Sequence, residues 1–188
     1  MHSDDIVAVD RWGNMAVICH SINCLMWGKT AIVVDGVSIS DSASFLKKQM
    51  AATRPGDQVE NPVEIGILAK AGAPVIAWAS MGIGLHYQST QTLLNIIEFG
   101  MNMEDAVNAP NLLAPISPAD NPMSVTLRVV EGVFDQDILE ACGFQFEPVS
   151  KEKIRFAQGL WVGVAKDPQT GELTAISPPY TNGWSVAN

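Results

Sequence analysis

The sequence is poor in charge, and poorer still in positive charge. Only 16% of its 188 residues are charged, and 20 acidic residues outnumber 11 basic ones, for a formal net charge of −9. A protein that binds a phosphate backbone needs a basic footprint, and an anionic membrane surface also attracts basic residues. The charge balance therefore argues against nucleic-acid and membrane-surface partners.

Long apolar runs are missing as well. No stretch approaches the roughly 18 consecutive apolar residues of a membrane-spanning helix, and no charged-then-apolar leader opens the chain. We therefore expect neither a span nor a signal peptide on this chain. The compartment stays open between cytoplasm and periplasm, because an export signal could lie on a partner.

Cysteine and histidine patterns are equally sparse. Three cysteines make an odd number and predict no disulfide framework, so we expect all three to be buried as small apolar side chains. They are Cys19, Cys24 and Cys142. The histidines share no spacing typical of metal ligands, so no metal site is predicted. They are His2, His20 and His86.

Apolar residues, by contrast, are abundant. They make up 47% of the chain, and the mean hydropathy is +0.16. The length suits a single domain over residues 1–188. Either the domain has a large core, or some apolar surface is buried against a partner chain; we favour the partner.

The first 23 residues predict a β-hairpin. Residues 6–10 and 15–21 read as strands, and residues 11–14 form a turn in which Gly13 can adopt a positive φ. A hairpin places the end of its second strand near the start of its first. Ser21, Ile22 and Asn23 should therefore lie beside the N-terminus.

The remaining pattern predicts hairpins followed by helices, which favours antiparallel sheets with helices packed outside. The expected strands are 31–34, 37–39, 63–70, 74–80, 124–130, 157–166 and 172–176, and the expected helices are 42–49, 86–99, 103–108 and 135–142. Strands 63–70 and 74–80 are nearly all apolar, which suits a sheet covered on both faces. Residues 111–123 hold three prolines and read as a connection.

The helix at 86–99 follows a glycine-rich break over residues 81–84. Its apolar residues recur at helical spacing and predict a stripe that faces the core. The stripe consists of Leu93, Leu94, Ile97 and Tyr87.

Four segments resemble the small subunit of the gamma-glutamyltranspeptidases. "VDRWGNMAVICHSIN" resembles its opening, "WASMGIGLHYQSTQTLLNIIEFG" its strand, glycine turn and helix, "NMEDAVNAPNLL" its short helix ending in Asn-Ala-Pro, and "GELTAISPPYTNG" its C-terminal strand and tail. The segments occur in the family's order and extend over nearly the whole chain.

The resemblance implies an N-terminal nucleophile hydrolase with an α+β fold, an αββα sandwich of two stacked antiparallel sheets, of which this chain is the small-subunit half. It further implies a self-cleaving precursor and a large-subunit partner in a heterodimer, or a dimer of heterodimers. The first residue of the small subunit attacks an amide carbonyl, and its α-amine, which titrates near 7.7 to 8.0 (roughly), serves as base. No metal or organic cofactor is implied.

The nucleophile itself departs from the family's threonine. Alignment without a gap puts Ser3 in that place, but its amine is free only if Met1 and His2 are removed. Alignment with a short insertion puts Met1 there, either as a start residue for separate expression or as a silencing replacement. We name Ser3; the alternative for Ser3, Asp4 and Asp5 is a solvated tail.

Other site residues follow from the same resemblance. Ser21 matches a hydroxyl that hydrogen-bonds the nucleophile, and Asn23 an asparagine that faces substrate and nucleophile. Backbone N–H groups at Gly82 and Ile83 match the oxyanion hole, where one donor contributes about 3–4 kcal/mol to transition-state stabilisation. Trp27 is expected to form a pocket wall, or else part of the core.

The substrate clamp departs most. The family binds the α-amine of a glutamyl group with an aspartate, where alignment places Ser44 or Phe45, with Asp41 the nearest acid. Asn61 and Pro62 replace a pair of serines that binds the α-carboxylate. An arginine that also holds this carboxylate belongs to the large subunit.

The sequence thus predicts an amide hydrolase that acts on a small amide other than an ordinary γ-glutamyl peptide, through an acyl-enzyme. One alternative is true γ-glutamyl hydrolysis or transfer, with Asp41 in the amine site. The other is a non-catalytic relative that uses the fold for binding or assembly.

Overall fold

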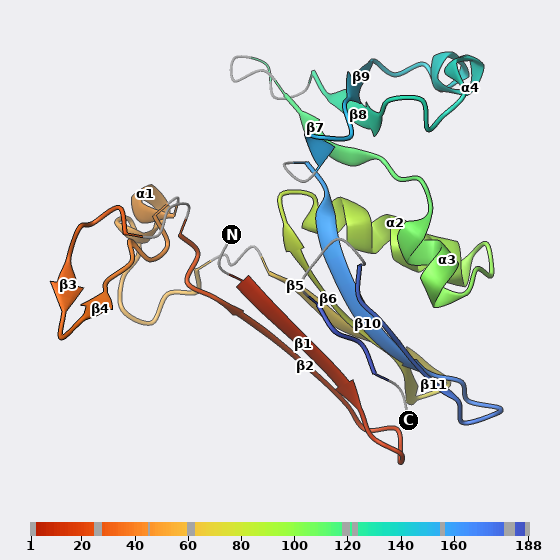
Figure 1. Ribbon diagram of the computed structural model, residues 1–188, viewed down its shortest axis with the longest axis horizontal. Helices are drawn as coiled ribbons and strands as arrows, with labels where there is room; N and C mark the ends of the chain where they lie inside the picture. The colour runs from red at the N-terminus through yellow and green to blue at the C-terminus, as the bar shows by residue number, and fades with distance from the viewer. Residues whose placement is uncertain are drawn as a thin grey trace.

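Two stacked β-sheets and one helical layer form the body of the protein (Figure 1). The computed structural model describes residues 3–24, 28–44, 46–59, 63–117, 121, 124–154, 157–178 and 183–186. A hairpin of β1 (Ser3–Val9) and β2 (Met15–Ser21) lies on one face of a four-stranded antiparallel sheet. That sheet has the order β11 (Leu173–Ile176), β10 (Gly159–Lys166), β6 (Ala73–Gly82), β5 (Glu64–Lys70).

The predicted β1–β2 hairpin is present, but β1 covers Ser3–Val9 and not residues 6–10. Its register runs from Ser3 opposite Ser21 to Val9 opposite Met15. The turn is fixed by the Asp10 carboxylate, which accepts hydrogen bonds from the backbone N–H groups of Trp12 and Asn14. Alternate residues are shielded, so one face of the hairpin packs on the larger sheet and the other is exposed.

The helical layer covers the opposite face of the larger sheet. It consists of α2 (Leu85–Ile97) and α3 (Met103–Asn108), and its core gathers around the fully buried Trp161 of β10. Ile76 of β6 and Met103 and Val107 of α3 pack against this tryptophan.

The face that α2 buries differs from the predicted stripe. The buried residues are polar, Gln88, Ser89 and Thr92, whereas the predicted stripe is largely exposed: Leu94 by 46%, Ile97 by 52% and Tyr87 by 43%. Glycine contacts explain the difference, since a Cβ on Gly159 would lie 2.7 Å from the Cβ of Gln88. Close approach of backbones decides the rotation of α2, and the Gln88 amide is satisfied by Thr92 and Asn111.

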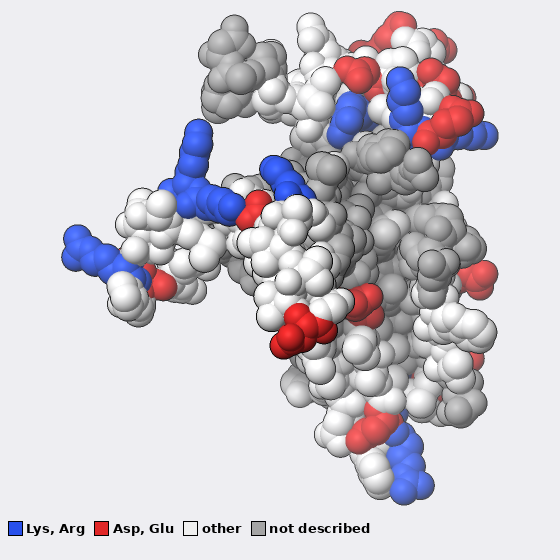
Figure 2. Space-filling model, turned by 60° about the vertical axis from the view of Figure 1, so that its left-hand side comes forward, with Lys and Arg blue, Asp and Glu red and all other residues white. Residues whose placement is uncertain are grey.

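Two lobes project from this body, as Figures 1 and 2 both show. The first holds β3 (Val33–Val34), β4 (Val37–Ser38) and α1 (Lys47–Met50), a helix shorter than the predicted 42–49. The second holds β7 (Leu113–Ile116), β8 (Thr126–Val130), α4 (Gln136–Ala141) and β9 (Phe146–Val149). On the face in Figure 2, lysine and arginine side chains gather over the lobes and at the lowest tip.

The second lobe contains two strands that the sequence did not predict. Each carries a proline, Pro115 in β7 and Pro148 in β9, and each lies at an edge of the sheet ordered β7-β8-β9, where a missing N–H is tolerated. β8 and β9 pair in parallel across α4, an exception to the antiparallel pattern.

The three cysteines are free thiols with different environments. Cys24 is buried as predicted and Cys19 is half-buried, but Cys142 is exposed, because it caps the solvent-facing helix α4. Among the described residues, no helix has the length and apolarity to span a bilayer.

Candidate active site

Ser3, Ser21 and Asn23 form one hydrogen-bonded chain where the N-terminal hairpin closes. The Ser3 hydroxyl donates to Ser21 Oγ at 2.9 Å, and the Ser21 hydroxyl donates to Asn23 Oδ1 at 3.1 Å. Ser21 Oγ also accepts the backbone N–H of Asn23 at 3.0 Å. The oxygen of Ser21 is thereby saturated, which fixes the direction of the Ser3 hydroxyl proton and leaves the Ser3 lone pairs available.

The backbone conformation of Asn23 explains how residues 21 and 23, so close in sequence, can hydrogen-bond to each other. Asn23 has a φ of 49°, in the left-handed region that asparagine tolerates better than most residues. The turn folds Asn23 back over Ser21, so that both its side chain and its N–H reach the same hydroxyl. Asparagine suits this position because it tolerates the left-handed backbone and also supplies a side-chain oxygen that accepts from Ser21.

Asp41 lies beside this turn but is already paired. The N–H of Ala43 donates to the carbonyl of Ile22 at 3.0 Å, which ties the segment around Asp41 to the Ser21–Asn23 turn. The Asp41 carboxylate contacts Lys47 Nζ at 2.5 Å. The Lys47 ammonium group therefore already pairs with the Asp41 carboxylate, which could otherwise bind a substrate amine.

The glycine turn between β6 and α2 depends on close backbone packing. Gly82 has a φ of 98° and pairs with Gly159, whereas Ile83 is 64% exposed. Gly84 is buried, and a Cβ there would lie 2.6 Å from the Ala157 carbonyl oxygen. Only glycine fits, so the turn brings the first backbone N–H groups of α2 to the end of the sheet.

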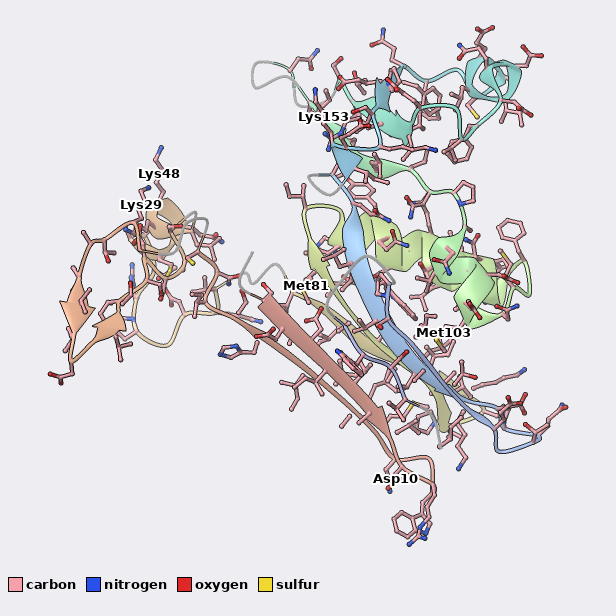
Figure 3. All side chains as sticks on the ribbon, in the orientation of Figure 1. Asp10, Lys29, Lys48, Met81, Met103 and Lys153 are labelled. Carbon is pink, nitrogen blue, oxygen red and sulfur yellow. The ribbon has the colours of Figure 1, made fainter. Side chains whose placement is uncertain are left out.

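The hydroxyl chain and the glycine turn lie at the same end of the sandwich. β1 and β10 run in the same direction, because Asp5 and Val7 lie beside Val162 and Val164, and Lys166 Nζ donates to the Arg11 carbonyl at 3.0 Å. Both strands therefore begin at the same end of the stacked sheets. The glycine turn lies at this end too, because Gly159, the first residue of β10, pairs with Gly82. In Figure 3, Asp10 lies at the end of the hairpin that is far from Met81.

Asp5 is an acid within the layer between the sheets, not part of a solvated tail. It faces Cys19 across the hairpin and lines a groove of about 240 Å³ whose other lining residues carry no charge. Burial raises the pKa of Asp5, and the Cys19 thiol offsets this only partly. Neither carboxylate oxygen accepts a hydrogen bond of good geometry from a described residue.

Cys19 is correspondingly inert as a nucleophile. Burial, together with the neighbouring Asp5 carboxylate, raises the pKa of this thiol to about 12. The thiolate is the reactive form, so Cys19 stays protonated at neutral pH and does not compete with Ser3.

A further pair, which the sequence reasoning missed, flanks the glycine turn. His86 Nδ1 lies 2.5 Å from Glu64 Oε2. These residues are 22 positions apart, and only the pairing of β5 with β6 brings them together. No local spacing could have indicated this contact.

Two predicted binding residues, Trp27 and Asn61, lie outside the described residues, as does Phe45. Within the part of the chain that the structure describes, no group of three histidine, cysteine or acidic side chains could hold a metal ion.

Several solved structures have an architecture similar to that of this chain. Gamma-glutamyltranspeptidase from Pseudomonas nitroreducens, in complex with L-DON, superposes with a TM-score of 0.71 at 17% identity, over 98% of each chain. The T380A mutant of Helicobacter pylori gamma-glutamyltranspeptidase gives 0.69 at 19%, over 93% of this chain and 98% of that one. The Bacillus anthracis transpeptidase CapD gives 0.67 at 15%, over 98% and 99%.

The chain has the gamma-glutamyltranspeptidase fold. No protein-family model matches the sequence, and no curated protein matches it significantly. The α+β class with stacked antiparallel sheets, predicted from the sequence, is confirmed. The similarity extends over nearly the full length of this chain and of the solved chains.

Proposed function

We propose that the chain is the catalytic small subunit of an amide hydrolase or acyltransferase of the gamma-glutamyltranspeptidase type, with Ser3 as nucleophile. The observation that carries the proposal is the hydrogen-bonded chain Ser3–Ser21–Asn23 at the sheet end that also holds the glycine turn. A hydroxyl with a fixed proton, opposite backbone N–H donors, is the arrangement that acyl transfer requires.

The reaction begins when Ser3 Oγ attacks the amide carbonyl carbon and a C–O bond forms. As Oγ attacks, its proton turns away from Ser21 Oγ and passes to the α-amine of Ser3, which removal of the two preceding residues has freed. The oxyanion meets the N–H groups of the turn at Gly82 and Ile83. Expulsion of the amine leaves an acyl-enzyme on Ser3, which water or an acceptor amine then resolves.

The preferred substrate is a small amide without the usual γ-glutamyl recognition. Asp41, the nearest acid to the expected amine site, is neutralised by Lys47 at 2.5 Å. A second ammonium at this position would meet an occupied carboxylate. The alternative, true γ-glutamyl transfer, requires Lys47 to leave Asp41 when substrate binds.

A large-subunit partner is part of the proposal. It would supply the carboxylate-binding arginine and cover the exposed apolar face of the hairpin, where Ile6 is 60% and Ile18 58% exposed. Exposed apolar patches of this kind mark interaction surfaces.

The test uses the complete native protein and a panel of γ-glutamyl, glutaryl, succinyl and acetyl p-nitroanilides. We expect the wild type to release p-nitroaniline from at least one, with an acyl adduct on Ser3 by mass spectrometry. Ser3→Ala should lower release by about 10⁴-fold or more, as loss of a catalytic nucleophile does. Ser124→Ala, an exposed serine in the second lobe, is the control.

Two results would overturn the proposal. One is undiminished turnover by Ser3→Ala. The other is a wild type that begins at Met1 and neither turns over nor acylates with any of the four compounds, which would favour the non-catalytic alternative. Fastest release from the γ-glutamyl compound would instead favour true γ-glutamyl transfer.

A further inference from the structure

Glu64 and His86 form a carboxylate–imidazole pair next to the glycine turn. Glu64 Oε2 lies 2.5 Å from His86 Nδ1, and the Glu64 side chain is shielded, being 24% exposed. The imidazole is 59% exposed, and its second nitrogen, Nε2, has no partner among the described residues. A carboxylate on Nδ1 fixes the tautomer and orientation of the ring, so that Nε2 is the atom free to exchange a proton.

The pair is anchored on both sides of the turn. Glu64 is the cross-strand partner of Ser80, two residues before Gly82, and His86 lies in the first turn of α2, two residues after Gly84. The contact therefore connects β5, the neighbour of the strand that enters the turn, with the helix that leaves it. The registers place Glu64, Ser80 and Trp161 on the helix-facing side of the larger sheet, whereas the N-terminal hairpin packs on its other side.

The other described histidine lacks these features. His20 precedes Ser21 in β2, but strand alternation turns it to the exposed outer face of the hairpin, away from the hydroxyl chain. Its register partner is Asp4, and no hydrogen bond joins their side chains. Of the two described histidines, His86 alone has an oriented ring beside the turn.

We propose that His86, oriented by Glu64, donates the proton that the leaving amine needs during acylation. The inference rests on the proposed function, because it requires an amide held between Ser3 and the glycine turn. It adds a proton donor on the helix side, opposite the nucleophile.

The proton and electron balance is complete without a further reactant. When the tetrahedral intermediate collapses, the C–N bond breaks and its electron pair stays on nitrogen, which takes the proton from His86 Nε2. The imidazole keeps its Nδ1 proton, which stays hydrogen-bonded to Glu64 Oε2. The water that attacks the acyl-enzyme then gives a proton back to Nε2, as it forms the new C–O bond to the acyl carbon. The bond between this carbon and Ser3 Oγ breaks, and Oγ regains its proton from the Ser3 α-ammonium, which restores both groups.

Leaving-group dependence tests the inference. We take the acyl group whose p-nitroanilide reacts fastest in the panel. The complete native protein is then given this acyl group as the unsubstituted anilide and as the p-nitrophenyl ester. Anilide nitrogen must be protonated to leave, whereas p-nitrophenolate leaves unprotonated. His86→Asn, which keeps an amide N–H near the position of Nδ1, should slow anilide acylation by about 10²-fold or more, the usual contribution of a general acid. Ester acylation should stay near the wild-type rate.

Glu64→Gln should lower the anilide acylation rate by a smaller factor, again with little effect on the ester. Thr90→Ala is the control. Thr90 is exposed and lies one turn after His86 in α2, so this variant should change neither rate. Equal losses on ester and anilide would show that His86 only supports the turn and would overturn the inference. An unchanged anilide rate would do so too. The proposed function fails separately, through turnover by Ser3→Ala, and ester turnover by His86→Asn verifies that the variant is folded.

Discussion

At the scale of single residues, Asp5 is an acid in an apolar layer without a matching donor. Its carboxylate oxygens are buried, and its pKa is raised by that burial. The folded state therefore keeps this proton to a higher pH than the unfolded state does. The corresponding stability is full below the reference value of 3.8 and is lost as pH rises through the raised pKa of the folded protein.

Asp5→Asn should remove this loss. We expect the variant to have a higher thermal midpoint than the wild type at pH 7, with the difference shrinking as pH falls toward the reference value of 3.8, because the wild-type carboxyl is then neutral as well. Asp4→Asn, on the exposed face of the same strand, should raise the midpoint much less, because the Asp4 charge is only a lesser cause of the raised Asp5 pKa. A lower midpoint for Asp5→Asn at pH 7 would mean that a cation pairs with this carboxylate in the native protein.

At the scale of elements, local patterns were sufficient for the hairpins but not for the strands that violate propensity. The turn at Arg11–Asn14 was predicted from Gly13, whereas β1 begins at Ser3, before the predicted start at residue 6. β7 and β9 contain prolines and form only because β8 lies between them. The prediction of the buried face of α2 was wrong, because Gly84 and Gly159 bring backbones together. Hydrophobic spacing does not encode this tertiary contact.

The same distinction applies to the candidate site. The resemblance located Ser3, Ser21 and Asn23, and the hairpin register brings them together. The Glu64–His86 and Asp41–Lys47 contacts depend on side-chain placement and were not predicted. Their roles remain predictions for the experiments described above.

Gly84 offers the sharpest test at this scale. A Cβ would lie 2.6 Å from the Ala157 oxygen and 2.7 Å from the Gly159 nitrogen, both backbone atoms. Gly84→Ala should therefore destabilise the protein by about 1–3 kcal/mol, as overpacking does, and it should also shift the turn and slow acylation. Thermal unfolding measures the first effect and p-nitroanilide release the second. Thr90→Ala controls for substitution in α2, and equal midpoints for both variants would contradict the close approach.

At the scale of the whole molecule, the layers are unbalanced. The larger sheet is covered by the hairpin on one face and by α2 and α3 on the other, but nothing among the described residues covers the outer face of the hairpin (Figure 1). Two-stranded ribbons are marginal on their own in water. The αββα arrangement leaves a place for a second helical layer at this face, and the proposed large subunit is its expected source.

Ile18→Lys tests this surface, because Ile18 is 58% exposed at the centre of β2 and points outward. Full burial of an isoleucine contributes about 1.5–3 kcal/mol, so the charged variant should bind its partner chain at least about tenfold more weakly. Co-purification from the complete precursor and native mass spectrometry measure the loss. Ile138→Lys, in α4 and 54% exposed, is the matched control. Equal losses for both variants would indicate a general effect on solubility, and an undiminished complex with Ile18→Lys would place the partner on another face.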